Sequence, residues 1–382
     1  MKKLLAALAA TVLTLSAAFA QNLPAPTIAA KSWLLLDMTS GQTLASQDLG
    51  TRVEPASLTK LMTVYLTFAA LKEKKLDMNQ TVNTSVHAWK VERSSSKMFI
   101  EPNKPVKIND LIHGLIVPSG NDAAIALAEA IAGTEDAFVT QMNHEAQRMG
   151  MKQTHFMNPH GLPSPENYST AEDLSILARR LIEDFPEYYP LFAIKSFTYN
   201  NISQNTRNRL LWLDPTVDGL KTGHTEGGGY SLIATAKRPN ATGDRRLISV
   251  VIGAASDQIR AQESLKLLNW GYQNFDTIKL YAKGVPVATP EVWKGSLSNV
   301  KIGFTRDIYV TVPKGTAEKM KPVLERKDPL VAPIAEYSPV GVLKMVADGK
   351  TIIELPLVAL QQVNPASFFG RTWDSIRLWM KK

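Results

Sequence analysis

Apolar residues recur at two different spacings in the first part of the chain. From Lys31 the run KSWLLLDMTSGQTLASQD holds two apolar-rich segments on either side of Ser40–Gly41, a pattern that predicts a β-hairpin. Between about Ser57 and Leu71 the apolar residues return every three or four positions, which predicts a helix.

Helical and strand-like segments then alternate up to about residue 275. The run LIHGLIVPSGNDAAIALAEAIAG predicts a helix, a break at Pro118-Ser119-Gly120 and a second helix that starts after Asn121 and ends at Gly133. Further helices are predicted in TEDAFVTQMNHEAQRMG, STAEDLSILARRLIED and IRAQESLKLLNWGYQNF, and strands in KSFTYN, GGGYSLIATAKR and RRLISVVIGAAS.

The pattern changes after about Asn274, where β-branched residues alternate with turn residues and helical spacing is largely absent up to Val363. We therefore expect a larger domain, the candidate catalytic domain, over residues 21–274 and a separate, small β-rich domain over residues 275–363.

The tail, residues 364–382, returns to helical spacing with its aromatic residues largely on one face and its charged residues elsewhere. This predicts an amphipathic helix that lies in a membrane interface. The alternative is a helix packed on the protein's own core. The terminal position, two Trp residues and a Lys-Lys end favour the interfacial helix, which is too short and too charged to span a bilayer.

Residues 1–20 have the pattern of a secretory signal. Lys2 and Lys3 precede an apolar run, and Ala18-Phe19-Ala20 offers small residues at the cleavage positions. A permanent membrane anchor is the alternative, but the run is short and rich in small residues. We expect cleavage after Ala20 and an exported protein.

Composition excludes several classes of function. The 382 residues are 45% hydrophobic, enough for two buried cores. The absence of cysteine excludes disulfides, thiolate nucleophiles and zinc–thiolate sites. The net charge of +8 is spread along the chain without a long basic run, so we expect no nucleic-acid partner. An anionic surface, such as a bilayer or a cell-wall polymer, would suit this charge as well as a nucleic acid would.

Three short motifs carry the chemistry. Ser57 and Lys60 form S-x-x-K, in which a lysine one helical turn away can act as the base for a serine nucleophile if its pKa falls toward neutrality. Ser119-Gly120-Asn121 gives S-x-N, and Lys221-Thr222-Gly223 gives K-T-G before a predicted strand. Each motif alone is common, but the three in this order are the signature of penicillin-binding proteins and class A β-lactamases.

Other candidate motifs are incomplete. His144-Glu145 lacks the second histidine of a zinc site because position 148 is arginine. The Gly227–Gly229 run lacks the lysine of a phosphate-binding loop, and we expect His160 to be a structural histidine. Glu166 lies outside the pattern of a β-lactamase deacylation glutamate, so we expect an exposed loop carboxylate. We expect neither a metal nor a cofactor.

From about Pro26 to its C-terminus the chain resembles the low-molecular-mass penicillin-binding proteins of the D-alanyl-D-alanine carboxypeptidase kind, with penicillin-binding proteins 5 and 6 as prototypes. The segments that carry the resemblance are EPASLTKLMT, PSGNDAAIALAEAIAG, MNPHGL, TVDGLKTGHT and RLISVVIG. It implies an α+β fold of the serine β-lactamase/transpeptidase type, with an antiparallel sheet flanked by helices, a C-terminal all-β domain and the terminal amphipathic helix.

The resemblance also implies a role for each motif residue. Ser57 attacks the carbonyl between two D-alanines, Lys60 takes its proton, Ser119 relays a proton to the leaving amine, and Asn121 positions the substrate amide. Lys221 lowers the pKa of Lys60 and attracts the negative end of the substrate.

The remaining roles concern the substrate carboxylate and the developing oxyanion. Thr222 and Gly223 belong to the carboxylate side, where Thr222 hydrogen-bonds the carboxylate. The backbone N–H groups of Ser57 and His224 form an oxyanion hole. Arg260 aligns with an arginine that fixes the carboxylate side, and Arg207 aligns with another one near it.

The implied reaction is hydrolysis of the terminal D-alanine from peptidoglycan stem pentapeptides, and the implied inhibitors are β-lactam antibiotics. Three alternatives stay open. A D,D-endopeptidase shares the motifs but usually lacks the β domain and tail. A β-lactamase needs a residue for fast deacylation, which we do not find. A wall-binding protein with a decayed site is the non-catalytic alternative. Oligomeric state is not indicated.

Overall fold

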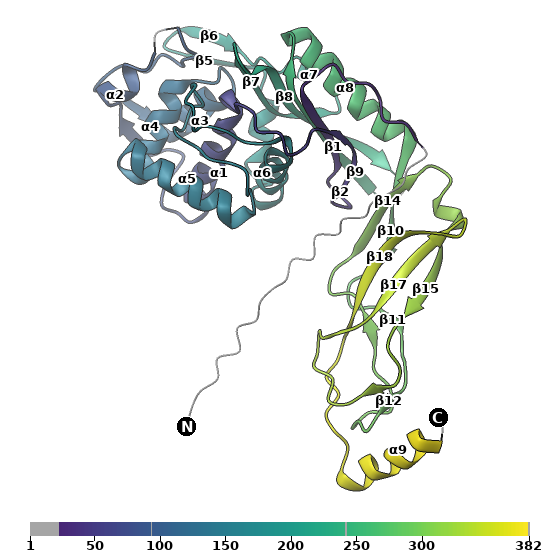
Figure 1. Cartoon of the computed structure of the whole chain (residues 1–382). Coiled ribbons are helices and arrows are strands. Elements are labelled where there is room, and N and C mark those ends of the chain that lie inside the picture. The colour runs from purple at the N-terminus through teal and green to yellow at the C-terminus, as the bar shows by residue number, and fades with distance from the viewer. Residues whose placement is uncertain (1–22, 93, 241–242, 381–382) are drawn as a thin grey trace, which may run out of the picture. The chain divides into compact units, whose positions relative to one another are not determined.

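The structure is a computed structural model that describes residues 23–92, 94–240 and 243–380 (Figure 1). The chain forms two compact units, one comprising Ala25–Thr277 and the other built mainly from Ile278–Lys382. The predicted signal segment, residues 1–20, lies outside the described residues.

The N-terminal unit is organised around a five-stranded antiparallel sheet in the order β2-β1-β9-β8-β7. The first two strands form the predicted hairpin, which turns at Gly41 with φ +76°. Strand β7 lies at the edge and pairs only with β8 in this sheet. The strand bounds are β1 Ser32–Asp37, β2 Gln42–Gln47, β7 Val217–Thr225, β8 Gly229–Asn240 and β9 Gly243–Ala254.

Helices cover both faces of this sheet (Figure 1). Helix α8 packs on β8 and β9 from one side, and α6 packs on β1 and β9 from the other. The predicted antiparallel sheet flanked by helices is therefore confirmed. The helix bounds are α1 Lys60–Lys72, α2 Val86–Trp89, α3 Ile108–Ile116, α4 Asn121–Ala132, α5 Glu135–Met149, α6 Ala171–Asp184, α7 Leu210–Leu213 and α8 Asp257–Asn274.

The ends of these helices follow from local sequence. Thr134, Thr170 and Ser256 each accept a hydrogen bond from a backbone N–H in the first turn of α5, α6 and α8.

Two short two-stranded sheets and a 3-10 turn complete the unit: β3 Thr81–Asn83 with β4 Pro105–Lys107, β5 Ser196–Tyr199 with β6 Ile202–Asn205, and η2 Tyr189–Ala193.

Helix α1 is largely buried. Ten of its 13 residues are buried, including three polar ones. The hydroxyl of Thr63 donates to the carbonyl of Pro159 at 2.6 Å, and that of Thr67 donates to the carbonyl of Thr63 at 2.7 Å. The residues just before it, Ala56–Thr59, form a 3-10 turn (η1), so the helix predicted from Ser57 begins instead at Lys60.

The C-terminal unit is a β structure, as predicted. Its main sheet has the strand order β11-β13-β18-β17-β15, and two-stranded sheets join β12 to β16 and β10 to β14. The bounds are β10 Phe275–Tyr281, β11 Pro286–Ala288, β12 Val292–Trp293, β13 Ile302–Gly303, β14 Ile308–Pro313, β15 Lys321–Glu325, β16 Leu330–Val331, β17 Pro339–Ala347 and β18 Lys350–Ala359, with a 3-10 turn, η3, at Ala317–Lys319.

The terminal helix α9 (Phe368–Met380) contacts this unit through two polar side chains that lie one helical turn apart. The carboxylate of Asp374 accepts the backbone N–H of Lys294 at 2.6 Å, and the guanidinium of Arg377 lies 5.2 Å from the ring centroid of Trp293. Six large apolar side chains of the helix are exposed by 46–83%: Phe368, Phe369, Trp373, Ile376, Trp379 and Met380.

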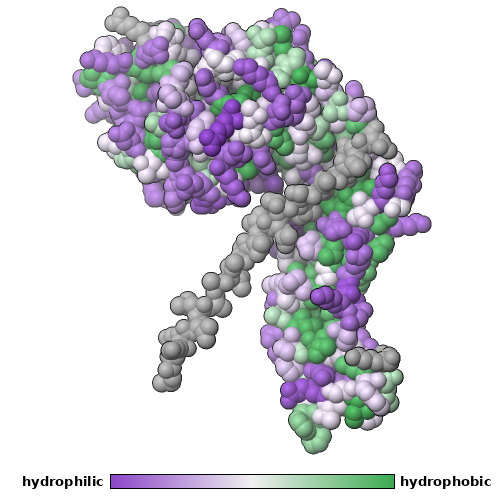
Figure 2. Space-filling view, viewed as in Figure 1, coloured by the Kyte–Doolittle hydropathy of each residue, from purple (hydrophilic) through white to green (hydrophobic). Residues whose placement is uncertain are grey.

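Figure 2 shows hydrophobic side chains at the end of the C-terminal unit that carries α9. Across the described segments, none of the helices combines the length and the apolar character that a membrane crossing requires.

Candidate active site

The hydroxyl of Ser57 and the amine of Lys60 are in direct contact. Ser57 is half-buried on the 3-10 turn η1, and Lys60, at the start of α1, is completely buried. Residues three apart eclipse one another in a 3-10 turn, and the Lys60 Nζ lies 3.1 Å from the Ser57 Oγ. The pair predicted from S-x-x-K therefore has the geometry for proton transfer between the two groups.

Burial changes the chemistry of Lys60. Its amine also donates to the Asn121 Oδ1 at 2.6 Å and to the carbonyl of His160 at 2.5 Å. Burial, and after it the charge of Arg207, lower the pKa of Lys60 to about 7, although the carboxylate of Asp122 acts in the opposite direction. A substantial fraction of Lys60 is thus neutral near pH 7 and able to accept a proton.

The S-x-N motif lies in the turn before α4. Ser119 has φ +65°, a left-handed conformation that is uncommon for a residue with a side chain. Asp122 holds this turn, because its carboxylate accepts backbone N–H groups from Met98, Phe99 and Ile100 at 2.9–3.2 Å. Ser119 and Asn121 thereby face the cleft from one rigid helix start.

The K-T-G motif lies on the edge strand β7. The Lys221 Nζ donates to the Ser119 Oγ at 2.9 Å, so the second and third motifs are in direct contact. Burial and the charges of Lys60, Arg207 and Arg260 hold the pKa of Lys221 well below its usual range. The charge of Arg207 thus lowers the pKa of both lysines, and Lys60 and Lys221 also disfavour each other's charged form.

Gly223 lets β7 approach the 3-10 turn that carries Ser57. A Cβ atom at Gly223 would lie 3.2 Å from the Leu58 Cγ and 3.2 Å from the carbonyl oxygen of Pro55. Gly161 approaches the same turn more closely, since a Cβ there would lie 1.8 Å from the carbonyl oxygen of Ala56. Two glycines thus allow backbone segments to clamp the turn.

Arg260 binds the backbone of β7 and β8. Its guanidinium donates to the carbonyls of Gly223 at 2.8 Å and Ser231 at 3.2 Å, and it pairs with the carboxylate of Asp257. Arg260 is nearly fully buried. Its hydrogen bonds therefore go to the protein itself and hold β7 next to β8.

Arg207 differs from Arg260 in being exposed. No hydrogen-bond or ion-pair partner of its guanidinium is found within the ranges that the structure describes, yet it lines the same cleft. Its charge lowers the pKa of Lys60, Lys221 and Arg260. A positive group in this position is available to an anionic ligand.

One cleft of about 660 Å³ brings the predicted residues together. Lys60 and Lys221 lie beneath its surface and reach it through Ser57 and Ser119. The ring of His224 packs on that of Tyr230 with centroids 3.9 Å apart. The predicted residues that line the cleft are Ser57, Ser119, Asn121, Arg207, Thr222, Gly223, His224 and Arg260.

Two residues judged incidental from the sequence, His160 and Glu166, differ in their position, since only His160 lines the cleft. Burial lowers the pKa of His160 to about 3, so its ring is neutral, and its contribution is the carbonyl that binds Lys60. Glu166 is exposed and does not line the cleft. In the described part of the chain, no group of three or more His, Asp and Glu side chains is arranged to hold a metal ion.

Sequence reasoning missed the supporting residues. Asp122 could have been suspected from its place in the first turn of α4, where acidic residues are favourable. The carbonyl of His160 left no sequence signal, because backbone contacts do not depend on residue type. A further cluster around Asp218, at the start of β7, was also missed.

Comparison with known proteins identifies the family. The D-alanyl-D-alanine carboxypeptidase model matches residues 18–256, and the model of the penicillin-binding protein 5 C-terminal domain matches residues 275–365. The chain belongs to the D-alanyl-D-alanine carboxypeptidase family. The family that the resemblance indicated is thereby confirmed.

Relatives of this carboxypeptidase family match along nearly the whole chain. The chain is 41% identical over 364 residues to D-alanyl-D-alanine carboxypeptidase DacC of Escherichia coli, covering 94% of this chain and 90% of the relative. It is 41% identical over 360 residues to DacA of Haemophilus influenzae, covering 93% and 91%.

Solved structures of the family agree with the fold. Penicillin-binding protein 5 from Haemophilus influenzae superposes with a TM-score of 0.86 at 40% identity, over 90% of this chain and 99% of that one. Penicillin-binding protein 6B from Escherichia coli gives 0.73 at 37% identity, over 87% and 96%. The predicted α+β fold with a C-terminal β domain is confirmed.

Proposed function

We propose that this chain is a serine-type D-Ala-D-Ala carboxypeptidase that removes the terminal D-alanine from peptidoglycan stem pentapeptides through an acyl-enzyme on Ser57. The observation that carries the proposal is the buried amine of Lys60, 3.1 Å from the Ser57 hydroxyl, with a pKa lowered to about 7. A neutral amine at this distance supplies the base that a serine nucleophile needs.

In the acylation step, the Ser57 Oγ attacks the carbonyl carbon between the two D-alanines and its proton passes to the Lys60 Nζ. The backbone N–H groups of Ser57 and His224 stabilise the oxyanion that forms, each by a few kcal/mol. The C–N bond then breaks, and the leaving amine takes a proton through Ser119, which hydrogen-bonds Lys221. Asn121 orients the substrate amide while its Oδ1 holds Lys60.

Water then completes the cycle. It attacks the acyl carbonyl, its oxygen bonds to the carbon, and the Ser57 Oγ leaves and regains a proton. A β-lactam presents a comparable amide within a ring, so its leaving amine stays attached after ring opening. We therefore expect β-lactams to form a lasting adduct on Ser57.

The K-T-G strand binds the substrate carboxylate in this proposal. The Thr222 hydroxyl donates to the carboxylate, while Lys221 and Arg207 supply positive charge. Arg260 acts through the strand, because its guanidinium holds the carbonyl of Gly223. Gly223 contributes by allowing the strand to lie close to the nucleophile turn.

The direct test is mass spectrometry of a stem pentapeptide incubated with the purified protein. Loss of one alanine is expected with the wild type, and no loss with Ser57→Ala. Intact-mass analysis with benzylpenicillin should show one adduct on the wild type and none on Ser57→Ala. An adduct that survives in Ser57→Ala would place the nucleophile elsewhere. Release of cross-linked stems in preference to D-alanine would favour an endopeptidase.

We also propose that the protein is exported and lies on the periplasmic face of the inner membrane. The signal-like residues 1–20 support export, and the exposed aromatic residues of α9 support peripheral binding to the bilayer. The proposed ranges are 21–274 for the catalytic domain, 275–363 for the β domain and 364–382 for the membrane helix.

A further inference from the structure

The edge strand β7 contains a β-bulge three residues before Lys221. Val217 is the partner of Ala236 on β8, and the next pair joins Gly219 to Thr235, so Asp218 is an extra residue in the ladder. Side chains alternate between the two faces of a strand, and one extra residue reverses the alternation beyond it. The bulge therefore decides which face of β7 Lys221 occupies.

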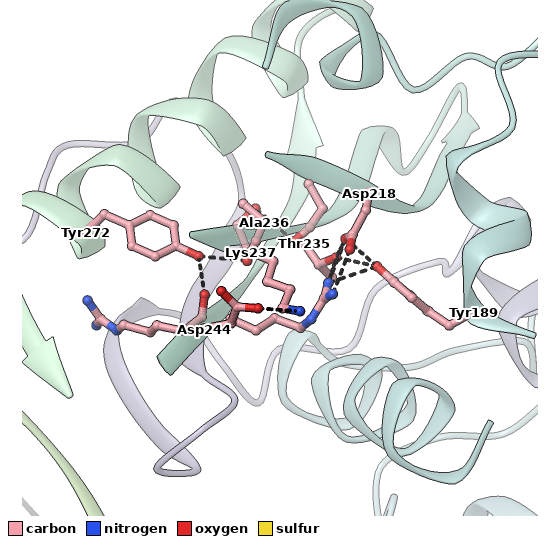
Figure 3. Close-up of polar contacts among 11 residues, drawn as sticks. Tyr189, Asp218, Thr235, Ala236, Lys237, Asp244 and Tyr272 are labelled. Atoms are coloured by element: carbon pink, nitrogen blue, oxygen red, sulfur yellow. Dashed lines mark hydrogen bonds and ion pairs between the residues drawn. The ribbon is translucent and has the colours of Figure 1, made fainter. Parts of the chain in front are cut away.

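Three side chains hold the bulged residue, Asp218, and form a cluster of four with it. The guanidinium of Arg246 forms two hydrogen bonds with the carboxylate of Asp218, both at 2.6 Å. The same carboxylate accepts the hydroxyls of Tyr189 and Thr235, each at 2.7 Å. Figure 3 shows Tyr189 and Asp218 directed toward one another with these bonds converging between them.

The four residues come from four separate elements: Tyr189 from η2, Asp218 from β7, Thr235 from β8 and Arg246 from β9. The cluster therefore ties the edge strand to its two neighbours in the sheet and to a turn beside it. Burial acts to raise the pKa of Asp218, but the hydrogen bonds from Arg246 and the two hydroxyls prevail, and the pKa lies below its usual value. The carboxylate is thus ionised, and both of its oxygens accept hydrogen bonds.

Gly219 fits the cluster against the strand. A Cβ atom at this position would lie 2.8 Å from the Tyr189 hydroxyl oxygen and 3.3 Å from the Phe192 Cβ. Only a residue without a side chain lets the tyrosine reach Asp218 from η2. The backbone that leads from the bulge to Lys221 is therefore constrained at Gly219.

We propose that Asp218, with Arg246, Tyr189 and Thr235, positions the carboxylate-binding end of the active site. The cluster fixes the bulge, and the bulge aims Lys221 at Ser119 and the cleft. This inference rests on the proposed function, since it assigns Lys221 to the substrate carboxylate. Asp218 is a positioning residue: it acts through β7 rather than by touching the substrate.

A positioning role and a merely structural role differ in their dependence on the ligand's carboxylate. Benzylpenicillin carries a carboxylate, whereas its methyl ester does not, so the ratio of their acylation rates measures how well Lys221 and its neighbours recognise that group. A general loss of stability reduces the folded fraction, which lowers both observed rates by the same factor and leaves their ratio unchanged. A displaced Lys221 lowers the rate for benzylpenicillin more.

The test compares acylation rates of full-length variants by intact-mass analysis. Asp218→Asn keeps the shape of the side chain but removes its charge, and we expect the benzylpenicillin rate to fall by about tenfold to 100-fold, the range produced by small misplacements of reacting groups. The ratio to the methyl ester should fall at least threefold. Thr235→Val, which removes one hydroxyl from the cluster, should give a smaller change in the same direction and serves if Asp218→Asn does not fold.

The matched control is Asp37→Asn. Asp37 pairs with Arg245, the residue beside Arg246 on β9, at 2.7 Å, and both side chains are almost completely buried. Neighbouring residues on a strand face opposite sides of the sheet, so this pair lies away from the Asp218 cluster. Asp37→Asn should lower the melting temperature without changing the ratio.

Each outcome bears on one hypothesis. A ratio that stays at the wild-type value in Asp218→Asn and in Thr235→Val overturns the positioning role, even if both variants melt earlier. An equal change in Asp37→Asn overturns it as well. A wild type that benzylpenicillin does not acylate refutes the proposed function instead.

Discussion

At the scale of single residues, the main property of the site is that it disfavours positive charge on its buried lysines. Lys60 and Lys221 are both buried, and Arg207 and Arg260 lie around the same cleft. Burial disfavours each ammonium, and each neighbouring cation disfavours it further. Such a site favours a neutral base at Lys60 before substrate binds, and it attracts an anionic group that compensates the remaining charge.

The acylation rate should rise with pH through the pKa of Lys60, near 7, because the base must be unprotonated. Arg207→Gln removes a cation that lowers this pKa, so the pKa should rise. The acidic limb of the pH–rate profile should therefore move to higher pH. The measurement is the rate of adduct formation with benzylpenicillin from pH 5 to 9. Lys60→Arg should be inactive throughout, because a guanidinium remains protonated. A limb that does not move in Arg207→Gln would show that Arg207 does not influence the base.

The residues found from the sequence are those whose chemical type the reaction itself requires. A nucleophile, a base and a carboxylate-binding lysine recur in short motifs, so Ser57, Lys60 and Lys221 could be recognised one by one. Asp218 and Arg246 could not, because 28 positions separate them and neither belongs to a motif. Their pairing depends on the strand order of the folded sheet, which the alternation of apolar residues does not specify.

At the scale of secondary structure, the active site is a contact between the 3-10 turn η1 and the edge strand β7. The turn carries Ser57 and the strand carries Lys221, and Gly223 lies where the two backbones approach. The spacing of apolar residues predicted a regular helix from Ser57. It did not reveal the tighter first turn, because a 3-10 turn and an α-helix place residues three apart on nearly the same face.

Gly223→Ala should separate these two elements slightly. The new methyl group would lie 3.2 Å from Leu58 and Pro55 atoms, closer than relaxed packing allows. We expect a loss of about 1–3 kcal/mol in the free energy of unfolding, the usual cost of overpacking, and an acylation rate lower by about tenfold. Denaturant unfolding and adduct formation measure the two effects.

The control for this substitution is Gly50→Ala, where the nearest atom to the added methyl group is 3.4 Å away on the side chain of Gln153. It should leave the acylation rate unchanged. A normal acylation rate in Gly223→Ala would mean that the close approach of turn and strand is not needed for acylation.

At the scale of the whole molecule, the proposed chemistry and the proposed membrane contact belong to different units. The motif residues lie between Ser57 and Arg260, and the exposed aromatic helix α9 lies in the C-terminal unit. The change of apolar spacing near residue 275 was enough to separate the two from the sequence. The order of strands in either sheet was not predicted, because it depends on pairings between residues far apart in the chain.

Removing residues 365–382 should release the mature protein from membranes and leave soluble acylation nearly unchanged. The aromatic face supplies apolar contact with the bilayer, and nearby Lys and Arg residues add about 1 kcal/mol each through anionic lipids. Flotation with vesicles that contain anionic lipid measures the binding. High salt should release the full-length protein only in part, because the apolar contribution is not screened.

A substitution within the intact helix separates the apolar face from the mere presence of the tail. Phe369→Ser combined with Trp373→Ser should release the protein as the truncation does. Ser375→Ala, on the same helix, should bind as the wild type does. Continued flotation of the truncated protein would place the anchor elsewhere, and an N-terminal residue of Met1 rather than Gln21 would point to an uncleaved signal.

The extensive burial of α1 has a consequence for the timing of local opening. Amide hydrogens exchange with solvent only when the segment that protects them opens, and elements with the most buried contacts open last. Helix α1 has ten buried residues of 13, whereas α9 has none. The amides just after Ser57 should therefore exchange only through unfolding of the whole domain. The proposed nucleophile, Ser57, directly precedes this slowly opening helix, so we expect an acyl group bound to it to keep one geometry for as long as the domain remains folded.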